Sequence, residues 1–79
     1  TVCYEIFREI VRVHRTIDAD RFLVYASQSV VDALTGDESH ALAEVEIFVG
    51  KQVKFQTESL YSQEKFDVIM MYFLREGET

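Results

Sequence analysis

The order of hydrophobic and polar positions divides the chain into helical and extended segments. Residues 2–17 place apolar side chains at steps of three and four, which is the spacing of one face of a helix. Residues 22–26 form a continuous apolar run of β-branched and aromatic side chains that is too short for a helix. Such a run between polar residues predicts a strand covered on both faces. The rest of the chain is expected to pack around this strand.

Two further helices are predicted between this strand and Gly50. Ser27 is a candidate N-cap for the first, because its hydroxyl can accept a bond from an otherwise unpaired amide. Gly36 is expected to end that helix as a left-handed C′ residue. The second is expected to open at residues 37–39 and to end at Gly50. Its inward-facing side chains are predicted to be Ala41, Leu42, Val45, Phe48 and Val49. Residues 45–49 also alternate in a way that fits a strand, so that alternative stays open.

The remaining pattern predicts at least one more strand. Residues 51–57 alternate cleanly between apolar and polar, which is typical of a half-exposed strand. A polar connection follows, with Leu60 and Tyr61 as its expected anchors. Residues 66–74 fit either a strand with two apolar rows or a helix with one stripe, and periodicity slightly favours the helix. The predicted fold class is α+β, with a small three-stranded sheet and the helices packed on one face.

Composition limits the class of protein more than it defines it. The chain has 79 residues, which suits a single domain, and it has one cysteine, Cys3, so no internal disulfide can form. Its net charge of −6 makes it a poor general binder of polyanions. We expect no membrane partner, because no apolar stretch is long enough to cross a bilayer. A start at Thr1 in helical pattern suggests a fragment of a longer protein.

No catalytic or metal site is predicted in this sequence. Cys3, His14 and His40 do not lie at ligand spacing from one another, and chance explains the paired acids of so acidic a chain. The serines sit at helix starts, where capping explains them. Gly36 and Gly50 are single glycines, so no phosphate-cradling loop is present. We therefore expect no catalytic residues, no metal ligands and no cofactor in the chain itself.

One candidate site for RNA lies on the first helix. Its arginines fall on one side of the helix, where Lys51 and Lys54 could join them, and the candidate residues are Arg8, Arg12, Arg15, Lys51 and Lys54. The alternative is a solvated face with ion pairs inside the helix. The order strand-helix-helix-strand also resembles that of KH domains, which clamp RNA with a G-x-x-G loop. Here the corresponding loop lacks the second glycine and is acidic.

The last apolar segment is a candidate surface for self-association. If residues 66–74 are a strand, the second apolar row needs cover, and another copy of the chain is a reasonable source of it. The candidate residues are Ile69, Met71, Phe73 and Leu74. The alternative is that the first helix or the tail covers this row.

Four stretches of running sequence resemble the C-terminal small domain of the bacterial ribonuclease E/G family. They are residues 1–14 (TVCYEIFREIVRVH), 20–27 (DRFLVYAS), 36–54 (GDESHALAEVEIFVGKQVK) and 60–71 (LYSQEKFDVIMM). The resemblance implies a single small domain, residues 1–79, that follows the catalytic core. Residues 72–79 depart from the family pattern and are interpreted as a possible tail outside it. The resemblance also favours a strand at residues 66–71, in a hairpin with residues 51–57.

The resemblance implies a function for the parent rather than for this chain. The parent would be a cytoplasmic, metal-dependent endoribonuclease that processes ribosomal RNA precursors and degrades messenger RNA. Magnesium on aspartates of the core and a zinc-binding cysteine pair are implied for that parent, and neither motif occurs here. The small domain is expected to be non-catalytic and to contribute to subunit association. Its expected partners are its own copies, with RNA as the parent's substrate.

Overall fold

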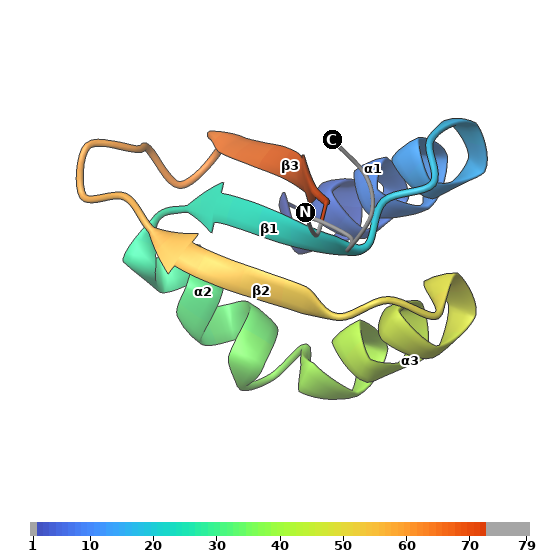
Figure 1. The fold of residues 1–79 in the computed structure, drawn as a ribbon. Coiled ribbons are helices and arrows are strands. Elements are labelled where there is room, and N and C mark those ends of the chain that lie inside the picture. The colour runs from blue at the N-terminus through green and yellow to red at the C-terminus, as the bar shows by residue number, and fades with distance from the viewer. Residues whose placement is uncertain (1, 73–79) are drawn as a thin grey trace.

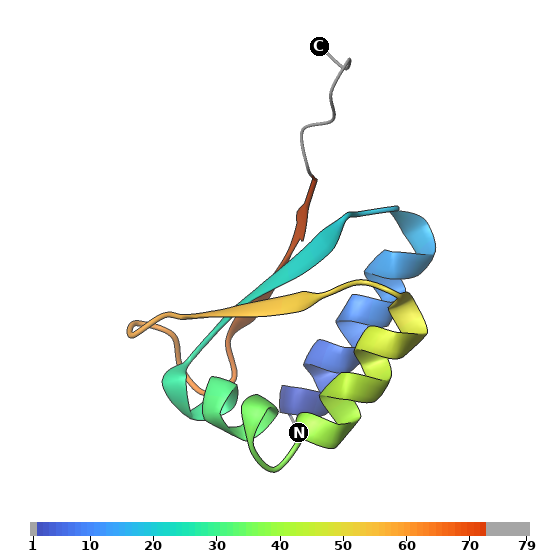
Figure 2. The ribbon, with the colours of Figure 1, turned by 60° about the horizontal axis from the view of Figure 1, so that its bottom comes forward.

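A computed structural model describes residues 2–72 of the chain (Figure 1). Its elements are α1 (Val2–Thr16), β1 (Arg21–Ala26), α2 (Gln28–Thr35), α3 (Ser39–Val49), β2 (Val53–Thr57) and β3 (Phe66–Met71). The strands form one sheet in the order β2-β1-β3, with β2 parallel and β3 antiparallel to β1. The helices lie on one side of this sheet (Figure 2). The predicted α+β class, element order and one-sided packing are confirmed.

The apolar run of β1 occupies the centre of the sheet. Phe22, Val24 and Ala26 are fully buried and point toward the helices, because alternate residues of a strand face the same side. Leu23 and Tyr25 point the other way and are only half-buried. The expectation that this run is covered on both faces is therefore not met by residues 2–72, whereas the prediction that the helices pack on one face is confirmed. Within residues 2–72, the helices pack on one face of the sheet and not on the other.

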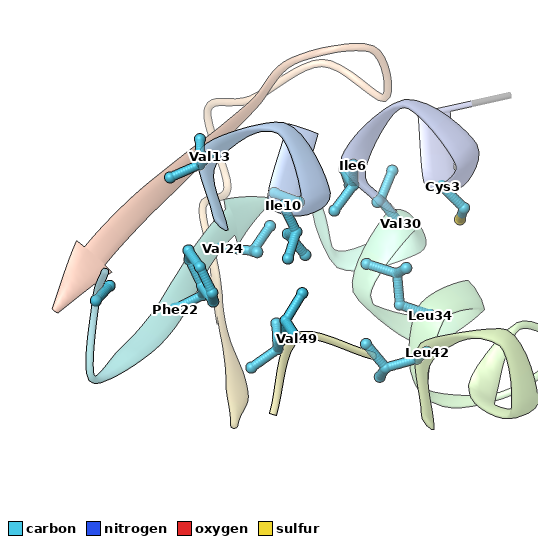
Figure 3. Close-up of a cluster of buried hydrophobic side chains, with 13 residues drawn as sticks. Cys3, Ile6, Ile10, Val13, Phe22, Val24, Val30, Leu34, Leu42 and Val49 are labelled. Carbon is cyan, nitrogen blue, oxygen red and sulfur yellow. The ribbon is translucent and has the colours of Figure 1, made fainter. Parts of the chain in front are cut away.

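The core forms between the packed face of the sheet and the apolar stripe of α1 (Figure 3). Ile6 and Ile10 of α1 are fully buried, as is Leu34 of α2. Phe22 and Val24 contribute the sheet side of the same cluster. The spacing that predicts α1 is thus the spacing of side chains that enter the core.

Most of the predicted helix ends are confirmed. Gly36 ends α2 as expected, but its φ of −112° and ψ of −99° are not the left-handed conformation predicted for it. The Ser27 hydroxyl accepts a hydrogen bond from the Val30 amide at 3.4 Å, as expected of an N-cap. Gly50 ends α3 with φ of 70°, a left-handed conformation that glycine adopts at little cost. Residues 45–49 are helical, so the strand alternative for them is wrong.

Two side chains lie elsewhere than predicted. Phe48 was expected to face inward but is 63% exposed, because Leu42 and Val49 already direct the apolar stripe of α3 toward the core. Its ring meets the His14 ring of α1 edge-on, with 6.5 Å between the ring centroids. Leu60, an expected anchor of the β2–β3 connection, is almost fully exposed.

The last described segment is a strand, but it does not form a hairpin with β2. β3 pairs with β1 from Phe66 opposite Ala26 to Met71 opposite Arg21, so β2 and β3 lie on opposite sides of β1. A hairpin would leave one edge of the most apolar strand without partners. The pairing observed gives β1 hydrogen bonds along both edges, and the connection between β2 and β3 is long enough to allow it.

Glu46 ties α3 to the start of β2. Its Oε2 atom accepts a hydrogen bond from the amide of Val53 at 2.9 Å, and Val53 is buried. We expect Glu46→Ala to lower the free energy of unfolding by about 1–3 kcal/mol, because the amide loses its acceptor away from water. Glu46→Gln keeps an oxygen acceptor and should lose less. Urea unfolding compares the free energies of unfolding of the two variants. Equal losses of free energy would show that the hydrogen bond does not contribute to stability.

Candidate functional site

The three arginines of α1 line one groove on the outside of the molecule. The groove has a volume of about 780 Å³ and runs along α1 beside Phe66 of β3. Phe7 and Val11 add apolar surface to it. Its charged and polar lining comes from Tyr4, Glu5, Arg8, Glu9, Arg12, Arg15 and Thr16. The structure therefore brings Arg8, Arg12 and Arg15 together, as the helical spacing predicts.

One of these arginines is held by an ion pair. The Arg12 guanidinium donates from Nε and Nη2 to the two carboxylate oxygens of Glu9, at 2.9 and 2.6 Å. These bonds lower the pKa of Glu9 and raise that of Arg12. The Arg8 guanidinium instead lies 5.8 Å from the centroid of the Tyr4 ring, within the range of a cation–π contact. Within this groove, Arg12 is therefore paired with a carboxylate, whereas Arg8 lies against an aromatic ring.

The two candidate lysines do not line this groove. Lys51 places its Nζ atom 3.5 Å from Oδ1 of Asp18, in the turn after α1. Lys54 lies beside Leu23 of β1, so its side chain is on the sheet face opposite the helices. The structure does not bring Lys54 to the arginines, because the alternation along β2 directs it to the other side of the molecule.

The side of the sheet opposite the helices, called here the open face, is the second candidate surface. Strand register assigns to it Arg21, Leu23, Tyr25, Lys54, Gln56, Asp67, Ile69 and Met71. Leu23 lies directly opposite Ile69, which is 41% exposed. Ile69 and Met71 therefore form a second row with the half-buried side chains of β1. Phe73 and Leu74, the other candidates for this surface, lie outside the described residues.

A hydrogen-bonded tyrosine lies beside the open face. The Tyr61 hydroxyl donates to Oδ2 of Asp67 at 2.5 Å, and the Lys65 ammonium is 4.8 Å from the Tyr61 ring centroid. The bond to Asp67 is the main cause that raises the pKa of Tyr61 to about 12. The pattern of the sequence indicates Tyr61 as an anchor but gives no signal for its partner, which comes from the next strand.

The pKa of Tyr61 should lie above the ordinary value for a tyrosine. Its neutral form donates to Asp67, so the stabilising effect is complete below the ordinary tyrosine pKa of about 10 and is lost as the pH rises through about 12. Absorbance of tyrosinate during an alkaline titration measures this directly. We expect Asp67→Asn to bring the titration of Tyr61 closer to the ordinary range. A Tyr61→Phe variant identifies the signal, and an unchanged curve in that variant would contradict the assignment.

The described part of the chain offers few other chemical groups. Across residues 2–72, no group of three or more His, Cys, Asp or Glu is placed to hold a metal ion. Cys3 is buried, and its desolvation, with a smaller effect of Glu38, raises the pKa of the thiol. None of the helices in this range has the length and apolar character that a bilayer crossing needs.

The chain has close relatives over most of its length. It is 76% identical over 71 residues to the protein named Ribonuclease G from Salmonella typhimurium strain SL1344, and 75% identical over 71 residues to that of Escherichia coli strain K12. Ribonuclease G of Haemophilus influenzae is 54% identical over 72 residues. Each alignment covers 90% of this chain.

The chain is similar to a segment of ribonuclease G. That segment is short, since the chain covers only 14% of the Salmonella and Escherichia ribonuclease G proteins and 15% of that from Haemophilus. No family model matches the chain. The resemblance to the ribonuclease E/G family that the sequence indicates is in agreement with these ribonuclease G relatives.

Proposed function

We propose that this chain is the C-terminal small domain of a ribonuclease G-like endoribonuclease, that it is non-catalytic, and that it contributes to subunit association. The identity of 54–76% to ribonuclease G proteins over 90% of the chain supports the relationship. The parent would be cytoplasmic and would process RNA, including ribosomal RNA precursors and messenger RNA. Magnesium and zinc are cofactors of that parent in this proposal, as the resemblance to the ribonuclease E/G family implies.

The observation that carries the association role is the open face. It sets Leu23 of the central strand against Ile69 of β3, and the helices all pack on the other side. Apolar side chains in a continuous row favour contact with another protein surface, since that contact removes them from water. The sheet therefore has an apolar row whose cover must come from outside the described elements.

The charge on this face is small, so a second copy can approach it with little repulsion. Among the paired strand residues, Arg21, Lys54 and Asp67 are the charged residues of the open face, although the chain as a whole has a net charge of −6. Two copies that meet through their open faces would bring together the less acidic parts of two acidic chains. The symmetric arrangement also suits a homo-oligomer, in which the same patch contacts itself.

Sedimentation equilibrium of the chain at several concentrations tests the association. We expect the association constant to rise with salt, because screening weakens the repulsion between two chains of charge −6 while apolar contacts persist. Monomer at every concentration up to the millimolar range, at both low and high salt, would contradict the proposal. Incubation of the same sample with single-stranded RNA and magnesium tests whether the chain is non-catalytic. Cleavage that persists after repurification would show that the chain is catalytic.

RNA binding by α1 is the second candidate function. The specific observation in its favour is that Arg8, Arg12 and Arg15 converge on one groove with Phe66. A KH-like clamp between α2 and α3 is not favoured, because that connection contains one glycine and is acidic.

A further inference from the structure

The groove along α1 combines cationic and aromatic side chains in one place. Tyr4, Phe7 and Phe66 line it together with the arginines, and two of these rings come from α1 while the third comes from β3. Proteins that bind single-stranded nucleic acid combine a cationic groove for the backbone with rings on which bases stack. We propose that this groove binds single-stranded RNA, with a base stacked on Tyr4 and phosphates contacted by Arg8 and Arg15. The proposal rests on the proposed function, which makes RNA the parent's substrate.

The state of each arginine decides which of them contact phosphate. Arg12 donates two hydrogen bonds to Glu9, so phosphate binding there would have to break a well-aligned pair. Arg8 and Arg15 are seven positions apart, about 10 Å along the helix axis, and both line the groove. They can therefore contact phosphates of neighbouring nucleotides. We expect two phosphate contacts rather than three.

Exposure of the rings favours Tyr4 as the stacking platform. The Tyr4 side chain is 61% exposed, and the Arg8 guanidinium at 5.8 Å lets a base contact a ring and a planar cation together. Phe7 and Phe66 are half-buried and supply the apolar floor beneath. A splayed base can use this surface, because its flat face gains contact with the rings.

Single-stranded RNA fits this combination of arginines and rings better than duplex RNA or an acidic peptide does. Duplex RNA keeps its bases stacked inside the helix, so the rings would have nothing to stack on. An acidic peptide would use the arginines but would have no flat base to stack on the rings. Only a flexible strand with phosphates and unstacked bases uses both features of the groove.

Titration of the 79-residue chain with a short single-stranded oligoribonucleotide at low salt tests the site, with amide shifts as the readout. We expect a dissociation constant of about 10⁻⁴ M, the weak end of sequence-independent binding. We expect the largest shifts in α1 and at Phe66, and weaker shifts with an RNA duplex and with polyglutamate. Two phosphate contacts on a single strand predict a slope of about −1.4 for the logarithm of the binding constant against that of salt.

Matched variants separate this site from general charge effects. Tyr4→Ala should weaken binding roughly tenfold, whereas Tyr72→Ala, which removes a ring of similar exposure (60%), should not. Arg8→Gln should weaken binding and halve the salt slope, whereas Lys54→Gln removes the same charge from the open face and should leave both nearly unchanged. Circular dichroism verifies that each variant is folded.

Each remaining outcome contradicts the proposal. Absence of shifts at low salt would remove RNA binding by this chain, and shifts centred on Lys54 would place it on the open face instead. Equal binding of duplex RNA or polyglutamate would exclude the stacking that the proposal requires. The sedimentation experiment on the open face is independent of these results, so a failure here leaves the association role standing, and the converse also holds.

Discussion

Phe22→Ala is expected to cost the chain most of its stability. Phe22 is fully buried at the centre of the sheet, between Val53 of β2 and Met70 of β3. Truncation of a buried phenylalanine lowers the free energy of unfolding by about 3–5 kcal/mol, through lost apolar burial and the cavity that remains. At about 0.05–0.15 kcal/mol per residue, the 79 residues have about 4–12 kcal/mol of stability in all, and a small domain lies toward the lower end of such a range. We expect the variant to be largely unfolded at room temperature or close to its midpoint in very little urea.

Leu23→Ala is the matched control for this prediction. The residue is the next one in the same strand, but it points to the open face and is only half-buried. We expect a loss of about 1 kcal/mol, as is usual for a partly exposed position. Urea unfolding followed by circular dichroism compares the two variants. Equal losses would mean that the core does not lie on the helix side of the sheet.

Ile69→Asp is expected to abolish or strongly weaken self-association while the fold survives. Ile69 is 41% exposed, so the monomer loses little apolar burial when the side chain becomes polar. In an association interface the new carboxylate would be removed from water in place of an apolar side chain, and it would lie two residues from Asp67 on the same face. We expect the association constant to fall at least about tenfold, which corresponds to about 1.4 kcal/mol.

Ile47→Asp provides the control for that effect. Ile47 is an isoleucine of α3 that is 80% exposed, so the substitution adds the same charge to the same acidic chain away from the open face. Association of this variant should stay close to that of the unmodified chain once salt screens the charge. If both variants lost association equally, added negative charge would explain the loss, and the open face would have no special role.

The sequence predicts much of this fold because local patterns agree with the packing. Helical spacing in α1 selects Ile6 and Ile10, which the structure buries, and Ser27 and Gly50 act at helix ends as their chemistry predicts. The arginines of α1 share a groove for the same reason, since their spacing alone sets one side of a helix. These features depend on residues a few positions apart.

The features that the sequence does not predict depend on distant parts of the chain. β3 pairs with β1 rather than with β2, because this pairing gives the central strand a partner on both edges. No local sequence pattern predicts that choice of partner. The same pairing leaves Leu23 beside Ile69 on an uncovered face. Alternation along β2 gives Lys54 a face, but only the sheet order shows that this face is opposite α1. The Tyr61–Asp67 bond likewise joins a loop to a strand.

The dependence of amide shifts on protein concentration tests the role of the open face most directly, because it maps contact residues without any substitution. Spectra of the chain from micromolar to millimolar concentration at high salt should change most at Leu23, Tyr25 and Ile69. Shifts concentrated instead in α3 around Ile47 and Phe48, or spectra that do not change with concentration, would contradict an association surface on the open face.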